Sequence, residues 1–162
     1  MHINKTFIVG LIAACAGLAG AVIASNYFFS GFKTSVINTF PVPDCDVLLR
    51  PCHSELPTGE SVTLTLSATL LPTMIPLNIE VQTENLDPLT IAVDFSGVDM
   101  FMGNNQPILT KKEGSTFTGK TILPICAKHN MPWEATVFID TKRGRIAAPF
   151  QFSVIKPASS LN

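Results

Sequence analysis

Five side chains with donor atoms suited to copper lie in two short stretches of the chain. Met100 and Met102 stand two positions apart in the first stretch, and Cys126, His129 and Met131 belong to the second. Thioether and thiolate sulfur suit Cu(I), and imidazole suits either copper oxidation state. If the first stretch is extended, Met100 and Met102 point to the same side, because strand side chains repeat every second residue. The residues therefore predict a copper site where the two stretches face each other.

The same side chains also have an ordinary structural interpretation. Methionine fills irregular gaps in cores and makes favourable contacts with aromatic rings, which Phe101 and Trp133 would offer here. A single loop histidine such as His129 is commonly only solvated. A blue-copper site also needs an upstream histidine on a neighbouring strand, and His53 precedes the first predicted strand, so we do not expect that class of site. Copper binding and core packing remain the two interpretations of the methionines.

Two further cysteines, Cys45 and Cys52, flank a short segment that includes Pro51. Their spacing is typical of neither a zinc site nor a thioredoxin-like redox motif. In an oxidising compartment we expect the two thiols to form a disulfide, and the alternative is that they bind or exchange a metal. With the disulfide formed, Cys126 remains a lone thiol, either buried and inert or a soft-metal ligand.

The compartment is predicted from the N-terminal segment. An apolar run over 6–29 follows the charged Lys5 and is about long enough to cross a bilayer as one helix. A signal anchor with residues 1–5 in the cytoplasm is the favoured interpretation, because positive flanking charge stays inside. The alternatives are a signal peptide cleaved before Ser25 and a lipoprotein acylated at Cys15. All three predict that the remaining chain lies in the bacterial periplasm, and the first anchors it to the inner membrane by a single pass.

The exported part has the periodicity of an all-β protein. After a connector predicted over 30–57, apolar and polar residues alternate with period two, which indicates strands with one buried face. Turn residues such as Asp87-Pro88 and Lys142-Arg143-Gly144 separate the strands. About seven such strands predict an immunoglobulin-like antiparallel β-sandwich over 58–156, with a small barrel as the alternative and a tail at 157–162. The predicted strands are centred on residues 62–68, 77–82, 89–95, 108–111, 116–123, 133–139 and 147–154.

Composition and motifs exclude several classes of function. The formal net charge is −1, and the sequence has no basic patch, so we expect no binding to nucleic acid. It contains no Gly-x-Ser-x-Gly motif, no phosphate-binding loop and no His-Glu-x-x-His motif, and we expect no enzyme activity. Cys126 and His129 are too close in one loop to form a nucleophile and base with an orienting partner.

Several short motifs lie in the predicted sandwich. They are Asp94-x2-Gly97-x2-Met100-x-Met102-Gly103, then Gly114-x-Thr116-Phe117-x-Gly119, Leu123-Pro124, Trp133 and Ala148-Pro149-Phe150. Together they resemble the FixH/YtkA-like family of small membrane-anchored periplasmic proteins with an exported immunoglobulin-like domain. The resemblance covers the anchor and about 60–155. It implies a role in copper handling or in the assembly of a copper-containing respiratory oxidase, with Met100 and Met102 at the matching turn.

Two functions of different classes follow. The first is a periplasmic accessory protein for copper handling or oxidase assembly, anchored in membrane lipid, with Met100, Met102, Cys126, His129 and Met131 as candidate ligands. The second is a structural or interaction subunit of a membrane protein complex without a metal, which docks its partner through an exposed strand edge. Sulfur atoms gathered at one exposed end of the fold would favour the first function, and sulfur atoms scattered through the core would favour the second.

Overall fold

The computed structural model describes residues 35–68, 74–124 and 130–155. The chain divides into two compact units, Met1–Thr34 and Ser35–Asn162, and all described residues belong to the second. Among the described residues, no helix has the length and apolar character that a membrane crossing requires. The predicted tip at 1–5, span at 6–29 and tail at 157–162 lie outside the described residues, as do the alternative processing sites at Cys15 and Ser25.

The described residues form nine strands and no helix. The strands are β1 (Val36–Thr39), β2 (Cys52–Glu55), β3 (Ser61–Ala68), β4 (Met74–Glu84), β5 (Thr90–Gly97), β6 (Thr110–Lys111), β7 (Thr116–Pro124), β8 (Asn130–Thr141) and β9 (Gly144–Ile155). The long strands show the alternation that the sequence predicts: in β8, every second side chain from Met131 to Ile139 is buried. Such strands have one apolar face, which must be covered by another layer.

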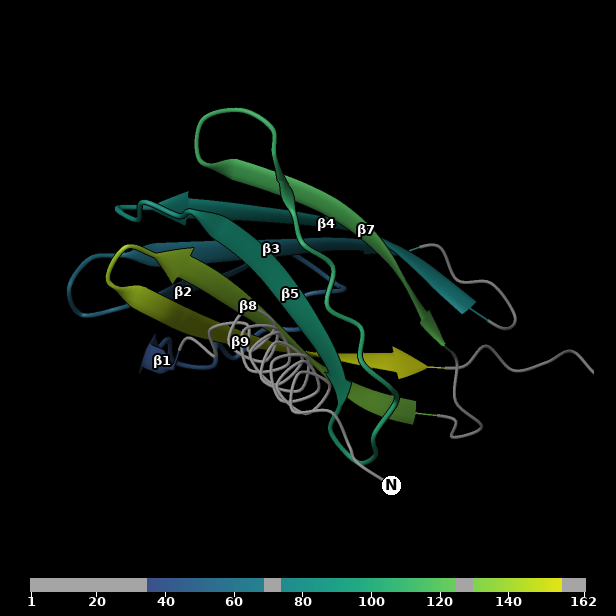
Figure 1. The fold of residues 1–162 in the computed structure, drawn as a ribbon. Coiled ribbons are helices and arrows are strands. Elements are labelled where there is room, and N and C mark those ends of the chain that lie inside the picture. Colours follow the sequence, from purple (N-terminus) through teal and green to yellow (C-terminus); the bar gives the residue numbers. More distant parts are fainter. Residues whose placement is uncertain (1–34, 69–73, 125–129, 156–162) are drawn as a thin grey trace, which may run out of the picture. The chain divides into compact units, whose positions relative to one another are not determined.

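Two sheets form the two layers seen in Figure 1. One sheet has the order β1-β9-β8-β5, and the other has the order β2-β3-β4-β7-β6. Neighbouring strands are antiparallel except β1, which runs parallel to β9. A single apolar core joins both sheets, and Trp133, Phe95, Phe150, Leu64 and Ile79 are among its almost fully buried side chains. The prediction of an all-β fold is confirmed, with strands at all seven predicted places.

The segment that the sequence predicts as a connector, 30–57, contributes two of the strands from Ser35 onward. β1 is exposed along its whole length, so it has no alternation that a pattern could detect. β2 does alternate, but one of its two inward residues is Ser54, whose hydroxyl donates to the Pro41 carbonyl oxygen at 2.6 Å. A buried serine does not add to a hydrophobic pattern, so the sequence pattern does not predict β2. Tertiary contacts determine that this segment joins the sheets.

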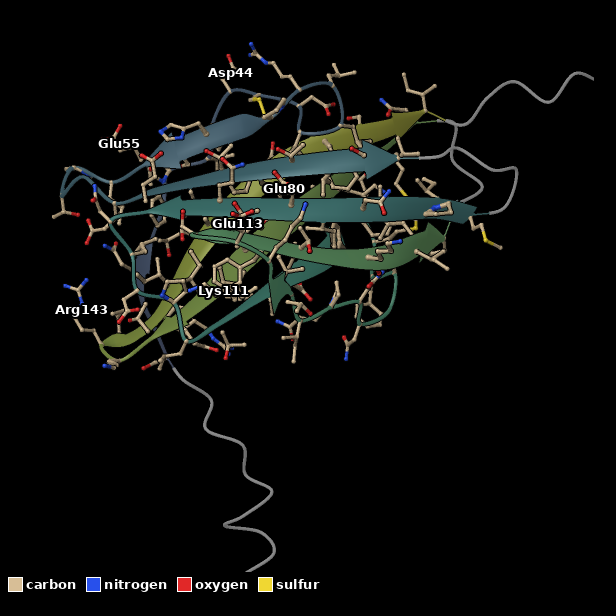
Figure 2. All side chains as sticks on the ribbon, turned by 90° about the horizontal axis from the view of Figure 1, so that it is seen from above. Asp44, Glu55, Glu80, Lys111, Glu113 and Arg143 are labelled. Carbon is tan, nitrogen blue, oxygen red and sulfur yellow. A yellow bond between two sulfur atoms is a disulfide. The ribbon has the colours of Figure 1, made fainter. Side chains whose placement is uncertain are left out.

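The two ends of this unit differ in chemical character. We call the end where β5 and β9 finish and β8 begins the methionine end, and the opposite end, with the β8–β9 turn, the hairpin end. The segment 98–105 at the methionine end has one charged residue, Asp99, whereas the β8–β9 turn consists of Lys142 and Arg143. Figure 2 shows Arg143 and Glu55 toward the same end of the sheets. The segment that carries Met100 and Met102 is thus nearly uncharged, whereas the β8–β9 turn is basic.

Candidate methionine site and disulfide segment

The candidate site is built around Gly97, the last residue of β5. Gly97 is paired with Trp133 of β8, and the Val98 N–H donates to the Pro132 carbonyl oxygen at 3.1 Å, which holds the start of the following turn against β8. A Cβ atom on Gly97 would lie 2.9 Å from Cε of Met131 and 3.2 Å from Cγ of Met102. Two methionines that are far apart in the sequence therefore meet over one residue without a side chain.

The backbone of the turn closes over the same point. The Met100 carbonyl oxygen would lie 2.6 Å from a Cβ on Gly97, which is shorter than any ordinary contact. A side chain at this position would push the turn away from β8. Gly97 is required here for the close approach of chain segments, since its φ angle is not among the positive ones of this chain.

The methionines have graded exposure at the rim of the core. Met131 is 3% exposed and belongs to the core, whereas Met100 and Met102 are half-buried and pack against it. Phe101 between them is 83% exposed. Trp133, which follows Met131 on the buried face of β8, stacks with Phe152 at a centroid distance of 6.3 Å. The thioethers thus lie beside an aromatic part of the core, where they are partly shielded from water.

Met100 and Met102 do not lie on a strand. The sequence predicts that both side chains point the same way if the strand continues, but β5 ends at Gly97 and the two residues lie in the turn that follows. They are still the two inward residues on either side of Phe101, because the turn folds back on the core. The physical reason for the early strand end is the close packing at Gly97 described above.

Three of the five predicted ligands can be placed. Met102 and Met131 lie together at Gly97, and Met100 contributes its backbone to the same point. Cys126 and His129 lie outside the described residues. Within the described ranges, no group of three or more His, Cys, Asp or Glu side chains could hold a metal ion. The methionines in the described ranges offer thioether donors, which fit Cu(I) and are poor ligands for hard cations.

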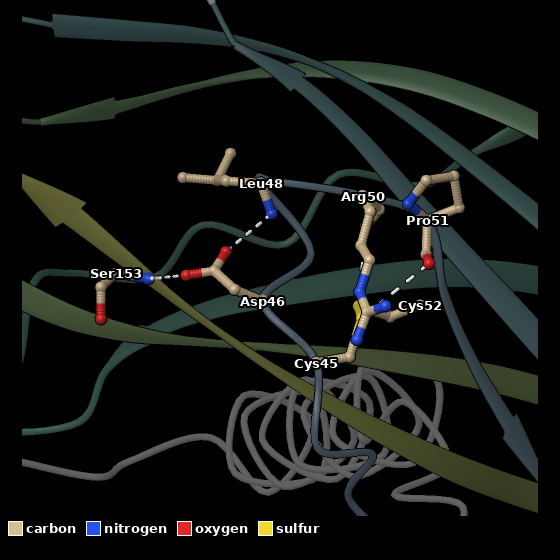
Figure 3. Close-up of a disulfide and its surroundings, with 7 residues drawn as sticks. All are labelled: Cys45, Asp46, Leu48, Arg50, Pro51, Cys52 and Ser153. Carbon is tan, nitrogen blue, oxygen red and sulfur yellow. Dashed lines mark hydrogen bonds between the residues drawn. A yellow bond between two sulfur atoms is a disulfide. The ribbon is translucent and has the colours of Figure 1, made fainter.

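The predicted disulfide between Cys45 and Cys52 is present, with Cα atoms 5.9 Å apart (Figure 3). Its sulfur atoms are bonded to each other, so the alternative of a metal held by these two thiols does not apply in this state. The disulfide closes a loop whose Val47 side chain is 1% exposed in the core. It therefore fixes a buried part of the fold.

Asp46 fastens this disulfide loop to β9. One carboxylate oxygen accepts the Leu48 N–H at 2.9 Å, and the other accepts the Ser153 N–H at 3.1 Å (Figure 3). The Val47 N–H also donates to the Gln151 carbonyl oxygen at 3.3 Å. The Asp46 carboxylate thus accepts a backbone N–H of β9 that a neighbouring strand would otherwise bind. No sequence pattern predicts this role for Asp46, and the only local signal is its place between Cys45 and the apolar Val47.

A cavity of about 520 Å³ separates the disulfide loop from the turn after β5. Cys45, Leu49 and Arg50 line one side, and Val98 and Pro132 line the other. Its lining mixes apolar side chains with the charged residues Asp44, Asp46 and Arg50, and Arg50 is exposed. The methionine site thus adjoins a surface depression.

The titratable groups with shifted pKa values lie away from the methionines. Burial raises the pKa of Asp94, and the charge of Glu134 on the adjacent strand raises it further. At the hairpin end, two hydrogen bonds from Arg145, of 2.7 and 2.9 Å, lower the pKa of Asp140. Neither carboxylate is placed beside a nucleophile, and both have structural explanations.

Comparisons with known proteins provide no relative. No family model matches the chain, no curated protein matches it, and no solved structure matches it. The function is therefore inferred from the residues and their placement.

Proposed function

We propose that this chain is a membrane-anchored periplasmic accessory protein that holds Cu(I) at its methionine end, for copper handling or for assembly of a copper-containing respiratory oxidase. The observation that carries the proposal is the meeting of Met102 and Met131 at Gly97. The proposal also rests on the resemblance of the motifs around Gly97 and Met102 to the FixH/YtkA-like family.

The domain is proposed to be an immunoglobulin-like sandwich. With β3 as the first strand, the sheet β3-β4-β7-β6 has the order A-B-E-D, and the sheet β9-β8-β5 has the order G-F-C. These are the two sheets of a constant-type immunoglobulin fold. β1 and β2 are additions at the edges, supplied by the segment before the first predicted strand. This order supports the fold that the family resemblance implies.

The donor chemistry favours Cu(I) as cargo. Met100, Met102 and Met131 offer thioethers, and a site with neutral sulfur donors favours the softer, singly charged ion. Cys126 and His129, which shortly precede Met131 in the sequence, would add a thiolate and an imidazole. The Cys45–Cys52 disulfide supports an oxidising compartment, as the periplasmic location requires.

A competition titration with Cu(I) tests this function. The full-length chain in lipid nanodiscs is titrated under anaerobic conditions with ascorbate, against a chromophoric Cu(I) chelator. Met102→Leu/Met131→Leu keeps the side-chain volumes nearly unchanged. Met74→Leu, at the start of β4 and at the same end of the sheets, is the control that distinguishes the proposed ligands from any nearby thioether. We expect the double variant to weaken the Kd by at least about tenfold, equivalent to about 1.4 kcal/mol, and the control to bind like the wild type. Equal affinity in all three proteins would remove the methionines from the site.

A second candidate is an interaction subunit without a metal. Phe101 is 83% exposed and Val98 is 55% exposed on the turn at the methionine end, and such apolar side chains commonly mark contact surfaces. In this case a membrane protein partner would co-purify with the chain after complete removal of metal, and Phe101→Ser would release it. Recovery of the chain alone from solubilised membranes would count against this function.

A further inference from the structure

The edge of β3 is open at the methionine end. β2 pairs with β3 from Glu55↔Ser61 to Cys52↔Leu64, and it begins there. β3 continues to Ala68, and over residues 65–68 its only strand neighbour in the described part of the chain is β4. β3 is therefore covered on both sides over its first half and on one side over its second half.

The backbone groups of Leu66 and Ala68 face this open side. The Thr83 N–H donates to the Ser115 carbonyl oxygen, so the odd-numbered residues of β4 direct their backbone toward β7. The even-numbered residues of β4 then bond β3, through the odd-numbered residues of β3 that face them in the register. Leu66 and Ala68 are left to face the side of β2, where the described residues give them no backbone partner.

An uncharged groove lies along this open edge. Its volume is about 510 Å³, and it is lined by Leu48, Leu49, Leu66, Ser67, Ala68, Ser153, Val154 and Ile155. Leu49 is 84% exposed and Ile155 is 61% exposed, so apolar surface faces water on both sides of the groove. None of the lining residues carries a charge, and a charged ligand would find no counterion there.

The two walls of the groove differ in their hydrogen bonding. On β9, the Ser153 N–H is already occupied by the Asp46 carboxylate. On β3, the N–H and C=O groups of Leu66 and Ala68, in line with the end of β2, have no backbone partner among the described residues. A ligand of this groove should therefore be able to form backbone hydrogen bonds on one side and apolar contacts on the other.

We propose that the groove binds an extended, uncharged peptide segment of a partner protein, which adds as a strand beside β3 in continuation of β2. An added strand exchanges hydrogen bonds with Leu66 and Ala68, and every second side chain points into the groove. Those side chains are apolar, because the groove is lined mainly by leucine, valine and isoleucine. This binding surface is independent of the metal and of the methionine cluster.

Hydrogen exchange followed by NMR tests the proposal on the full-length chain in nanodiscs. The probe is a short blocked peptide of alternating threonine and valine. We expect the amides of Leu66 and Ala68 to exchange rapidly in the free protein and to slow by at least about tenfold with peptide, equivalent to about 1.4 kcal/mol. The amides of Thr65 and Ser67 are protected in both states, because they bond to β4. Unchanged exchange at Leu66 and Ala68 with saturating peptide would overturn the proposal.

N-methylated peptides separate strand addition from simple apolar binding. Residues opposite Leu66 and Ala68 share their side-chain direction, so the valines would donate the cross-strand hydrogen bonds. N-methylation of the valines should abolish binding, and N-methylation of the threonines should leave it unchanged. Equal binding of both forms would show a groove that takes any apolar group, such as a lipid acyl chain, and would overturn the proposal.

Two pairs of variants complete the test. Ala68→Pro removes an N–H that the β4 ladder does not use and should abolish binding, whereas Ala68→Val keeps the N–H and should bind. Leu49→Asp places a charge at the groove and should weaken binding at least about tenfold, with the exposed Leu89→Asp, remote from the groove, as control. Thermal unfolding verifies that each variant is folded. Equal binding by Ala68→Pro and Ala68→Val would contradict the addition of a partner strand. Tighter binding after removal of 157–162 would also contradict it, because it would identify the tail as the occupant of the groove.

Discussion

The hairpin end and the methionine end of the domain are held together by different forces. At the hairpin end, the turn between β8 and β9 is secured by the Arg145–Asp140 pair, and Arg145 also lies over the ring of Phe138 at 5.4 Å. At the methionine end, the chain is held by close packing at Gly97 and by the stacked rings of Trp133 and Phe152. The difference teaches that an ion pair organises the hairpin end, whereas the end with the proposed binding functions depends on apolar burial.

The largest expected effect is the loss of the Trp133 side chain. Trp133 is 1% exposed, stacks on Phe152 and is paired with Gly97. Trp133→Ala should lower the free energy of unfolding by about 3–5 kcal/mol, because it leaves a large cavity beneath the methionine end. Chemical denaturation measures the change. Phe138→Ala, which removes a half-buried ring near the hairpin end, should cost clearly less, and equal costs would contradict the asymmetry between the ends.

The disulfide is expected to come next. The Cys45→Ala/Cys52→Ala variant should lose about 2–3 kcal/mol, because opening a loop of this length raises the chain entropy of the unfolded state. Part of this loss arises because the open loop no longer holds Val47 in the core. Denaturation curves of the wild type with and without a thiol reductant measure the same quantity. Coincident curves would show that the Asp46 contacts alone hold this segment on β9.

A methyl group on Gly97 tests the close packing at the methionine end. Gly97→Ala should cost about 1–3 kcal/mol, because the new Cβ meets the Met100 carbonyl oxygen at 2.6 Å and the backbone must shift. Gly119→Ala is the matched control. Its Cβ would lie 2.5 Å from Cδ2 of Leu109, but the end of a leucine side chain can rotate away. We expect the Gly119 variant to be the more stable of the two in thermal unfolding, and the reverse order would contradict the role of Gly97.

At the hairpin end, Arg145→Gln should cost about 1 kcal/mol or less, since the pair is partly exposed. The pKa of Asp140 is lowered by the hydrogen bonds from Arg145. The stabilisation is therefore complete above the ordinary carboxyl pKa and is lost as the pH falls through the lowered value. Denaturation of both proteins across acid pH should show their stabilities converging. Arg143→Gln removes the 3.6 Å ion pair with Glu60 and should cause no measurable loss, because the Arg143 side chain is 74% exposed.

A small effect of opposite sign is expected for Asp94 on the outer face of the β5–β8 pair. Its pKa is raised by burial and by Glu134, so the folded state disfavours the ionised carboxylate. This cost appears as the pH rises above the ordinary carboxyl pKa. Asp94→Asn should therefore be slightly more stable than the wild type at neutral pH and equal to it in strong acid. A loss of stability at neutral pH would show that the carboxylate makes a favourable contact instead.

Much of the fold was predictable from local pattern. A strand with one buried face must alternate apolar and polar residues, and β3, β4, β5 and β8 do so along nearly their whole length. The disulfide was predictable because two cysteines close in sequence have few other uses in an oxidising compartment. β1 and β2 were not predictable, because an exposed strand and a buried serine give no hydrophobic periodicity.

The sequence by itself determined that this chain builds strands of one-sided hydrophobicity, places sulfur donors in two separate stretches and closes the Cys45–Cys52 loop. Tertiary structure decided which of these features meet. Gly97 lies against Trp133, which brings Met131 to Met102, and Asp46 reaches Ser153 although more than half of the chain separates them. Such contacts between distant residues depend on strand order and register across two sheets. No local pattern encodes either of these, because a period of two specifies a face and leaves the neighbour open.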